Sequence, residues 1–259
     1  MRYTEAPTRR AELLRRLSAE GYISSAEVAT ELGVSDMTIR RDLHQLERDG
    51  LARRVAGGAS IPSGADEALP FEQRDLAGAS QKRAIASRAA ESITGATLAL
   101  DAGTTVAAFA SLVAPGTTVI THSVPVFSLL AARGDVELIS TGGSYQRDTR
   151  SFAGAIAEAS LEHLSADVAV LSATAIDERG VYCANANDVP MKRALAAIAT
   201  RVVVLADSSK IDSRAPIRLA PLSRIDAIIT DDSVTTKQLR MLRGSGVEVL
   251  VAARAEVTV

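Results

Sequence analysis

Short runs of apolar residues, many of them β-branched, recur from residue 97 onward and constrain the fold more than any other feature of the sequence. Each run is nearly continuous in apolar residues, which is the pattern of a strand covered on both faces. The runs occupy residues 97–102, 117–123, 136–142, 168–174, 201–208, 225–232 and 247–252. Ala-rich segments of helical length precede or separate them, at residues 80–94, 106–113, 124–132, 155–164, 188–200 and 233–242. This alternation predicts a mostly parallel α/β sheet with helices on both faces.

The first 58 residues differ in character from the rest of the chain. All ten of their basic residues are Arg, and nine acidic residues oppose them. Residues 59–80 contain two Pro and two Gly and show no sustained hydrophobic period, which is typical of a linker. We therefore expect a small domain at residues 1–58, a linker at 59–80 and an α/β domain at 81–259.

Composition excludes several classes of protein. The formal charge of −2 excludes a polybasic protein that binds nucleic acid by bulk charge, so any nucleic-acid site must be local. A single cysteine, Cys183, excludes a disulfide scaffold and multi-cysteine metal sites, and we expect a buried structural thiol there. The three His are scattered, so we expect no metal and no cofactor. Because no stretch approaches the roughly 18–20 apolar residues that span a bilayer, we expect a soluble, cytoplasmic protein.

Three helices are predicted near the N-terminus. The first covers residues 8–20, with Leu at positions 13, 14 and 17 on one face, and ends at Gly21. The second begins with the capping-box pattern Ser24-x-x-Glu27 and runs to residue 32. A tight turn at residues 33–35 leads to the third helix, with Ser35 as its N-cap and apolar residues at 39, 43 and 46. Two helices joined by such a turn form a helix-turn-helix pattern.

The polar face of the third helix suits contact with DNA. In such motifs the start of the second helix of the pair enters the major groove, where Arg pairs bidentately with guanine. Residues 51–59 then predict a two-stranded wing beside the DNA backbone. The candidate DNA-binding residues are Ser35, Met37, Thr38, Arg40, Arg41, His44, Gln45, Arg53 and Arg54. The other interpretation is a small helical bundle whose arginines are merely solvated.

The run Val-Ser-Asp-Met-Thr-Ile-Arg-Arg-Asp-Leu at residues 34–43 closely resembles the winged-helix signature of the DeoR family of bacterial sugar-metabolism regulators. The resemblance continues through Leu-Glu at 46–47, Gly-Leu at 50–51 and Arg-Arg-Val-Ala-Gly-Gly-Ala at 53–59. One difference lies at Ala56, where that signature commonly has a His. It concerns a contact of the wing and not the fold.

Polar residues follow several of the predicted strands of the α/β domain. The sequence Asp-Ala-Gly-Thr-Thr at 101–105 runs directly into a helix, and backbone N–H groups there favour an anion such as phosphate, although such turns also serve for capping alone. Residues 121–123, 141–143 and 207–210 end other strands at the same edge, outside which ligands of open α/β sheets bind. Lys210 there is either a cation for a phosphate or carboxylate or a member of a surface ion pair. Lys192 lies in the first turn of a predicted helix, where it is either a second cation for the ligand or a solvated residue.

The same segments resemble the DeoR sensor domain in order: residues 82–86, 101–105, 141–143, 154, 167, 206–210 and 229–231. That sensor is similar in fold to ribose-5-phosphate isomerase, and the resemblance implies a phosphorylated sugar as effector. It assigns the phosphate to Gly103, Thr104 and Thr105, close backbone approach to Gly142 and Gly143, and charge pairing to Lys210. Asp101, Ser123 and Lys192 would contact the sugar or line its pocket. Two differences are His122, where the family often has Asn, and residues 172–177, which replace a more Gly-rich strand end.

The leading hypothesis is a DNA-binding transcriptional regulator, expected to be a repressor of sugar catabolism whose operator affinity a sugar phosphate changes. Helix-turn-helix proteins usually read palindromic sites as dimers, so we expect a homo-oligomer, a dimer or tetramer, bound to double-stranded operator DNA and not to a membrane. The alternative is a sugar-phosphate isomerase-like enzyme with an appended DNA-binding domain. Its general base would be Asp101, His122 or Asp177, none of which has an evident acid partner in the sequence. We therefore expect no catalytic residues.

Overall fold

The computed structural model describes residues 6–20, 22–49, 51–55, 57–60 and 71–253 of the 259-residue chain. Contacts divide the chain into two compact units, Met1–Ser80 and Gln81–Val259. The finer division into residues 1–58, 59–80 and 81–259 stays a prediction. Part of the segment predicted as a linker is helical and forms α4 (Phe71–Leu76). Phe71 is buried, and α4 contacts the first helix of the chain.

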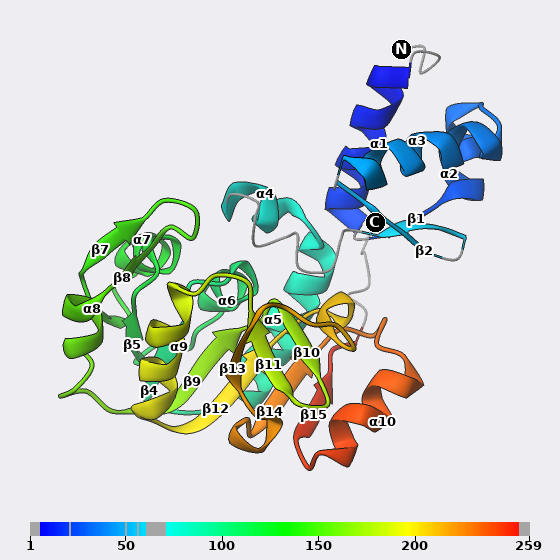
Figure 1. Cartoon of the computed structure of the whole chain (residues 1–259). Coiled ribbons are helices and arrows are strands. Elements are labelled where there is room, and N and C mark those ends of the chain that lie inside the picture. The colour runs from blue at the N-terminus through cyan, green and yellow to red at the C-terminus, as the bar shows by residue number, and fades with distance from the viewer. Residues whose placement is uncertain (1–5, 21, 50, 56, 61–70, 254–259) are drawn as a thin grey trace. The chain divides into compact units, whose positions relative to one another are not determined.

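Besides α4, the described part of the N-terminal unit has three helices and a small antiparallel sheet (Figure 1). The helices are α1 (Ala6–Glu20), α2 (Ser25–Leu32) and α3 (Asp36–Arg48). The strands are β1 (Tyr22–Ser24), β2 (Arg53–Val55) and β3 (Gly58–Ser60), in the order β1-β3-β2. The two predicted wing strands are present as β2 and β3. Strand β1 was not predicted, because three residues are too few to show a period.

Local sequence signals explain where these helices begin and end. The Ser24 hydroxyl accepts a hydrogen bond from the backbone N–H of Glu27 at 3.4 Å, which is one of the two bonds of the predicted capping box. Gly33 ends α2 with φ of +66°, a conformation that favours glycine. The Ser35 hydroxyl accepts from the N–H of Thr38 at 3.2 Å and begins α3. The core of the unit is apolar, and its buried side chains include Leu13, Leu17, Ile23, Ile39, Leu43 and Leu46.

The C-terminal unit is built on a seven-stranded sheet in which all neighbouring strands are parallel. Its strands are β4 (Thr97–Leu100), β5 (Thr118–Thr121), β6 (Glu137–Ser140), β9 (Ala166–Ser172), β12 (Ala199–Leu205), β14 (Ala227–Thr230) and β15 (Glu248–Val251). Their order across the sheet is β15-β14-β12-β9-β4-β5-β6. Each of the seven predicted apolar runs therefore supplies one strand of this sheet.

Helices cover both faces of the sheet, which explains why its strands are apolar without alternation. Within β9, Val168 and Val170 pack with α5 (Ala79–Ser92), α6 (Thr104–Ala110) and α7 (Val124–Ala131). Ala169 and Leu171 face the opposite layer, formed by α8 (Ala155–Ala159), α9 (Asp188–Ala197) and α10 (Thr236–Gly244). Helix α8 is shorter than the predicted 155–164, because residues 160–163 form turns. The prediction of a mostly parallel α/β domain is confirmed.

Two small antiparallel elements were not predicted. Strands β7 (Ser144–Gln146) and β8 (Ser151–Ala153) form a hairpin. Strands β10 (Ala175–Asp177), β11 (Gly180–Cys183) and β13 (Ile217–Ala220) form a second sheet, in which Cys183 is fully buried as expected. Short 3₁₀ helices lie at Ser208–Lys210 and Leu222–Arg224. None of the helices in the described ranges is long and apolar enough to cross a membrane.

Candidate functional site

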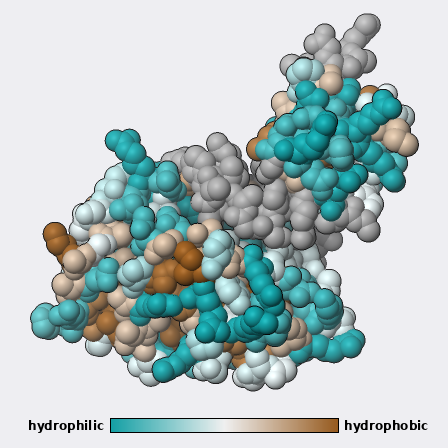
Figure 2. All heavy atoms as spheres, in the orientation of Figure 1, coloured by the Kyte–Doolittle hydropathy of each residue, from teal (hydrophilic) through white to brown (hydrophobic). Residues whose placement is uncertain are grey.

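The side of α3 opposite the core carries the predicted DNA-binding side chains. Met37 is 64% exposed, and Arg40, Arg41 and His44 are also exposed. Thr38 and Gln45 are half-buried on the same side. Figure 2 shows that hydrophilic residues dominate the visible face of these N-terminal helices. The face is therefore open to a partner that offers hydrogen-bond acceptors and negative charge.

Several of these polar side chains already have partners within the unit. Arg40 forms an ion pair with Asp36 at 2.7 Å, one turn away on the same helix. Gln45 donates to the Asp49 carboxylate at 2.8 Å. Among the described residues, Arg41 has no hydrogen bond or ion pair, so its guanidinium is the one on this face that can pair with a base without first leaving another group.

The wing is tied to α3 by Glu47. Its carboxylate accepts from the Arg54 Nε at 2.7 Å and from the Arg54 backbone N–H at 3.1 Å. These bonds lower the pKa of Glu47 and keep it ionised. Arg54 is thus held beside the third helix, which suits a contact to the DNA backbone. The side chain of Arg53 and the whole of Ala56, both discussed from the sequence, lie outside the described residues.

One feature of α3 was missed from the sequence. Asp42 is buried and forms an ion pair with Arg9 of α1, which is buried too. A charged residue beside Leu43 in the middle of an amphipathic helix was the available signal. The pair fixes α3 against α1, and so sets how the exposed face is presented.

The strand order places a topological switch point between β4 and β9. From β4 the chain continues outward through β5 and β6, and it then returns to β9 and runs outward through β12, β14 and β15. Ligands of open α/β sheets bind at such points, outside the carboxyl ends of the strands. Asp101 directly follows β4 and Ser172 ends β9, so both lie at this point.

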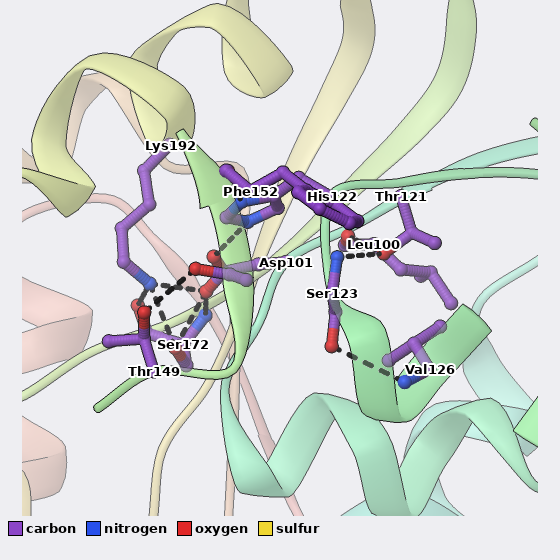
Figure 3. Close-up of polar contacts among 11 residues, drawn as sticks. Leu100, Asp101, Thr121, His122, Ser123, Val126, Thr149, Phe152, Ser172 and Lys192 are labelled. Atoms are coloured by element: carbon purple, nitrogen blue, oxygen red, sulfur yellow. Dashed lines mark hydrogen bonds and ion pairs between the residues drawn. The ribbon is translucent and has the colours of Figure 1, made fainter. Parts of the chain in front are cut away.

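Four buried or half-buried residues meet at the switch point, and we call them the polar cluster: Asp101, His122, Ser172 and Lys192 (Figure 3). One carboxylate oxygen of Asp101, Oδ2, accepts from the Ser172 backbone N–H at 2.9 Å and from the Ser172 hydroxyl at 2.6 Å. It also pairs with the Lys192 ammonium. The other oxygen, Oδ1, lies 3.2 Å from His122 Nε2.

The cluster keeps Asp101 ionised. Burial by itself would raise the pKa of Asp101, but the Lys192 ammonium and the His122 hydrogen bond outweigh it and hold the pKa of this carboxyl well below its usual range. His122 Nδ1 lies 2.9 Å from the carbonyl oxygen of Phe152. Each ring nitrogen of His122 therefore faces an acceptor, the Phe152 carbonyl or the Asp101 carboxylate.

Lys192 is a member of this cluster and not the solvated first-turn residue of the alternative interpretation. Its side chain is 5% exposed. Besides Asp101, its ammonium donates to the Ser172 hydroxyl at 2.9 Å and to the Ser172 carbonyl at 3.1 Å. Helix α9 delivers it from 91 residues further along the chain than Asp101. Sequence spacing cannot show such a contact.

Gly103 is required here by close packing. Its φ of −75° is ordinary, so a free turn is not the reason for glycine. A Cβ at this position would lie 2.2 Å from the Ser172 Cβ and 2.3 Å from its hydroxyl oxygen. Ser172, which the sequence marked only as the first residue of the altered strand end at 172–177, therefore packs directly on the start of α6. There Thr104 and Thr105 are buried and begin the helix.

The remaining candidates lie at neighbouring strand ends. Ser123 is buried and caps α7, accepting from the Val126 N–H at 3.3 Å. Gly142 and Gly143 follow β6 with φ of +63° and +112°, in the region that favours glycine. Lys210 is buried at the end of the 3₁₀ helix after β12. The four strand ends predicted to share one edge are thus all carboxyl ends of one parallel sheet.

The β7–β8 hairpin also contributes to this region. Thr149 and Ser151 are buried, their hydroxyls lie 2.8 Å apart, and Figure 3 draws Thr149 in the same close-up of polar contacts. Within the described ranges, no group of three or more His, Cys, Asp or Glu is placed to hold a metal ion. Around the Asp101 carboxylate the side chains gathered here carry hydroxyl, ammonium and imidazole groups, which can donate to an anionic or hydroxylated ligand.

Comparison with known proteins gives matches over nearly the whole chain. Ribose 5-phosphate isomerase A from Neisseria gonorrhoeae is similar in structure over 51% of this chain and 53% of its own, with 18% identity and a TM-score of 0.38. The "Putative aga operon transcriptional repressor" of Escherichia coli O157:H7 is 35% identical over 96% of this chain and 95% of its own length. The transcriptional repressor GlcR of Bacillus subtilis is 32% identical over 94% of this chain and 95% of its own.

Both units match domains of one family. Residues 9–64 match the DeoR-like helix-turn-helix domain. Residues 78–232 match the DeoR C terminal sensor domain. The glycerol-3-phosphate regulon repressor of Escherichia coli K12 is a further relative, 32% identical over 85% of this chain and 88% of its own. The chain therefore belongs to the DeoR family of DNA-binding transcriptional regulators.

Proposed function

We propose that this protein represses a carbohydrate-catabolism operon in the cytoplasm and that a phosphorylated sugar releases it from its operator. The printed names of the relatives support this, since they include repressors of an aga operon and of a glycerol-3-phosphate regulon. The observation that carries the effector half of the proposal is the polar cluster at the switch point between β4 and β9. It gathers donors and one fixed charge pair where α/β sheets bind ligands.

The DNA-binding half rests on the exposed face of α3. Arg41 is exposed and unengaged in the described structure, which suits bidentate pairing with a guanine in the major groove. Met37 is 64% exposed at the start of the helix, and an apolar side chain there matches the methyl group of thymine. The remaining proposed contacts come from Ser35, Thr38, Arg40, His44, Gln45, Arg53 and Arg54. A homo-oligomer would present two such helices to a palindromic operator.

The effector half assigns roles at the carboxyl edge of the sheet. The phosphate is proposed to lie near Gly103, Thr104, Thr105 and Lys210, with Gly142 and Gly143 allowing close backbone approach. Asp101 and Lys192 already satisfy each other, so they hold the walls of the site in place more than they bind sugar directly. His122 and Ser123 act with them, since both are buried and hydrogen-bonded in the same region.

Binding without turnover is the interpretation that the chemistry of the candidate bases supports. A general base needs a pKa near the working pH and a lone pair within reach of the substrate. Both oxygens of Asp101 are occupied, and its pKa is held well below the usual range. Asp177 has a lowered pKa as well, because the Arg214 hydrogen bond overcomes the effect of burial. These groups are anchors, and an isomerase would need a poised base in their place.

Induction follows from coupling between the two sites. An effector lowers operator affinity only by as much as it binds the DNA-incompetent state more tightly than the DNA-bound state. We therefore expect the sugar phosphate to bind free protein more tightly than operator-bound protein, by the same factor by which it weakens operator binding.

Thermal unfolding with a panel of sugar phosphates tests the proposal. Glucose 6-phosphate, ribose 5-phosphate and glycerol 3-phosphate are each compared with the unphosphorylated parent. A ligand at about 100 times its Kd stabilises the folded state by about 2.7 kcal/mol, which raises the melting temperature measurably. A hit is then titrated into an operator complex followed by fluorescence anisotropy, and is also assayed for turnover.

We expect one phosphate to raise the melting temperature and release the operator without being consumed. Lys210→Ala should abolish operator release, weaken the thermal stabilisation so that much higher ligand concentrations are needed, and leave operator affinity intact. Equal shifts with a phosphate and its parent sugar would contradict the phosphate site. Consumption of the phosphate by the wild-type protein would support the enzyme instead.

A further inference from the structure

Two segments leave the carboxyl ends of neighbouring strands beside the polar cluster. Leu205 of β12 pairs with Ser172 of β9 across the sheet. After Ser172 the chain enters β10, and after β12 it enters residues 207–214, which we call the Lys210 segment. The Lys210 segment thus starts next to Ser172, and its position decides where the Lys210 side chain lies relative to the cluster.

Main-chain contacts join the Lys210 segment to β10. Ile176 and Ile211 form an isolated parallel β-bridge. The backbone N–H groups of Asp212 and Ser213 both donate to the Ile176 carbonyl, at 2.8 and 3.2 Å. Asp212 has φ of +64°, a strained value for a residue other than glycine. Such a conformation persists where the surrounding structure holds it.

A buried carboxylate completes this junction. Asp177, at the end of β10, is 3% exposed and accepts from Arg214 Nε at 2.5 Å. Its other oxygen accepts from the Tyr182 hydroxyl at 3.0 Å and from the Arg179 backbone N–H at 2.8 Å. Burial raises the pKa of the Tyr182 hydroxyl, and its bond to Asp177 adds to this effect. Arg214 is 56% exposed and comes from the far end of the Lys210 segment.

The opposite side of the segment is held by α10. Lys237 pairs with Asp212 at 2.5 Å. The Gln238 amide donates to the carbonyls of Ser208 and Ile211, at 3.0 and 2.8 Å. The Lys210 segment is therefore fixed between α10 and β10, and Asp177 with Arg214 forms its side-chain connection to β10.

We propose that Asp177 and Arg214 are a positioning pair for the effector site: by fastening the Lys210 segment to β10, they hold Lys210 in register with the polar cluster and so set the affinity for the anion. This inference rests on the proposed function, because it takes Lys210 as a phosphate contact. From the sequence, Asp177 was only a candidate general base of the enzyme alternative, and the inference gives it a positioning role instead.

Inorganic phosphate is the probe for the test, with sodium chloride at matched ionic strength as the reference. The half-saturating phosphate concentration is obtained from melting temperatures of the full-length protein. We expect Arg214→Ala and Asp177→Asn to raise it about tenfold, within the range of coupling found between groups in contact. Arg214→Lys, which keeps the charge near Asp177, should recover part of the loss.

Two comparisons separate positioning from general loss of structure. In a Lys210→Ala background, Arg214→Ala should cause no further change, because the pair acts through Lys210. Arg201→Ala is the matched control. It breaks an exposed ion pair with Glu248 at 2.7 Å near the opposite end of β12, and it should leave phosphate binding unchanged.

Hydrogen exchange adds a measurement that needs no ligand. In Arg214→Ala the amides of Asp212 and Ser213 should exchange at least several-fold faster, with no change in β9. Unchanged half-saturation and unchanged exchange in Arg214→Ala would overturn the inference, as would losses that add to those of Lys210→Ala. If the wild-type protein shows no saturable response to phosphate, the proposed function falls and the inference falls with it. A wild-type response with unaltered variants overturns the inference alone.

Discussion

Replacing Lys192 with Met should destabilise the sensor domain strongly at neutral pH. Asp101 is 1% exposed and Lys192 is 5% exposed, so the substitution removes the ammonium from a carboxylate that water does not reach. Removing one partner of a buried ion pair costs about 3–5 kcal/mol, because the remaining charge is left without full compensation. The Ser172 and His122 bonds to Asp101 survive the change, so we expect the lower end of that range, about 3 kcal/mol.

The pH dependence gives this prediction its signature. In the folded wild-type protein the pKa of Asp101 is lower than in the unfolded chain, where it is about 4. The stability that ionised Asp101 contributes is therefore complete above about pH 4 and is lost as the pH falls through the lower pKa of the folded protein. Without Lys192, only the remaining hydrogen bonds offset the effect of burial, and the pKa of Asp101 should rise. Protonation then relieves the variant as the pH falls, so the stability gap between the two proteins should shrink from pH 7 toward pH 4.

Urea unfolding followed by circular dichroism measures the gap, and mass-detected hydrogen exchange of β9 assigns it to the sensor domain. With a urea dependence of about 2 kcal/mol/M, a loss of about 3 kcal/mol lowers the midpoint by about 1.5 M. The double variant Asp101→Asn/Lys192→Met carries no buried charge pair and should recover at least half of the loss. A midpoint change below about 0.5 M, or a gap that is constant between pH 7 and pH 4, would refute the reasoning.

The remaining predictions concern single contacts. Arg41→Ala should cost about 1–3 kcal/mol of operator affinity and relax specificity at one base pair. Arg54→Ala should instead weaken binding to all DNA sequences and reduce the slope of log affinity against log salt concentration by about one. Fluorescence anisotropy titrations at several salt concentrations measure both effects, and an equal loss on all sequences in Arg41→Ala would argue against a contact between Arg41 and a base. Asp42→Asn should destabilise the N-terminal unit by about 3 kcal/mol, because it breaks a buried pair, and unchanged thermal unfolding would show that the pair contributes little. Gly103→Ala should cost about 1–3 kcal/mol of sensor stability by overpacking against Ser172, and Gly103→Ala/Ser172→Gly should recover part of that loss in urea unfolding.

The central sheet was predictable because helices cover both of its faces and its inner strands are largely buried on both sides. A strand such as β9 then reads as a continuous apolar run that no exposed face interrupts. The hairpin β7–β8 and the sheet of β10, β11 and β13 have strands of only three or four residues. Five strands of the central sheet are equally short but lie in continuous apolar runs, whereas polar residues such as Gln146 and Asp177 interrupt these strands. No Asn-Gly or Asp-Gly turn marks the hairpin either.

The sequence predicted at which edge of the sheet the candidate site lies, but not which side chains contact one another there. Strand ends could be assigned to one edge because parallel strands share their direction. The contacts could not be predicted in this way, because Ser172 and Lys192 lie 71 and 91 residues after Asp101 in the sequence. Only the folded sheet brings the three side chains together. The packing constraint on Gly103 could not be predicted for a related reason. Its constraint comes from a neighbour in space and not from its own backbone angles.

The strand order also has a consequence for synthesis on the ribosome. Strands β4, β5 and β6 emerge together, but the partner that covers the other side of β4 is β9, and Ser172 follows Asp101 by 71 residues. At roughly 5–20 residues per second, the ribosome needs about 4–14 s to deliver it. During that interval the nascent chain carries an unpaired apolar strand edge, which is the kind of surface that aggregates or recruits a chaperone. Slower codons upstream of β9 would lengthen this exposure, and substitutions in β4 should lower the yield of folded protein more than equally buried substitutions in β14.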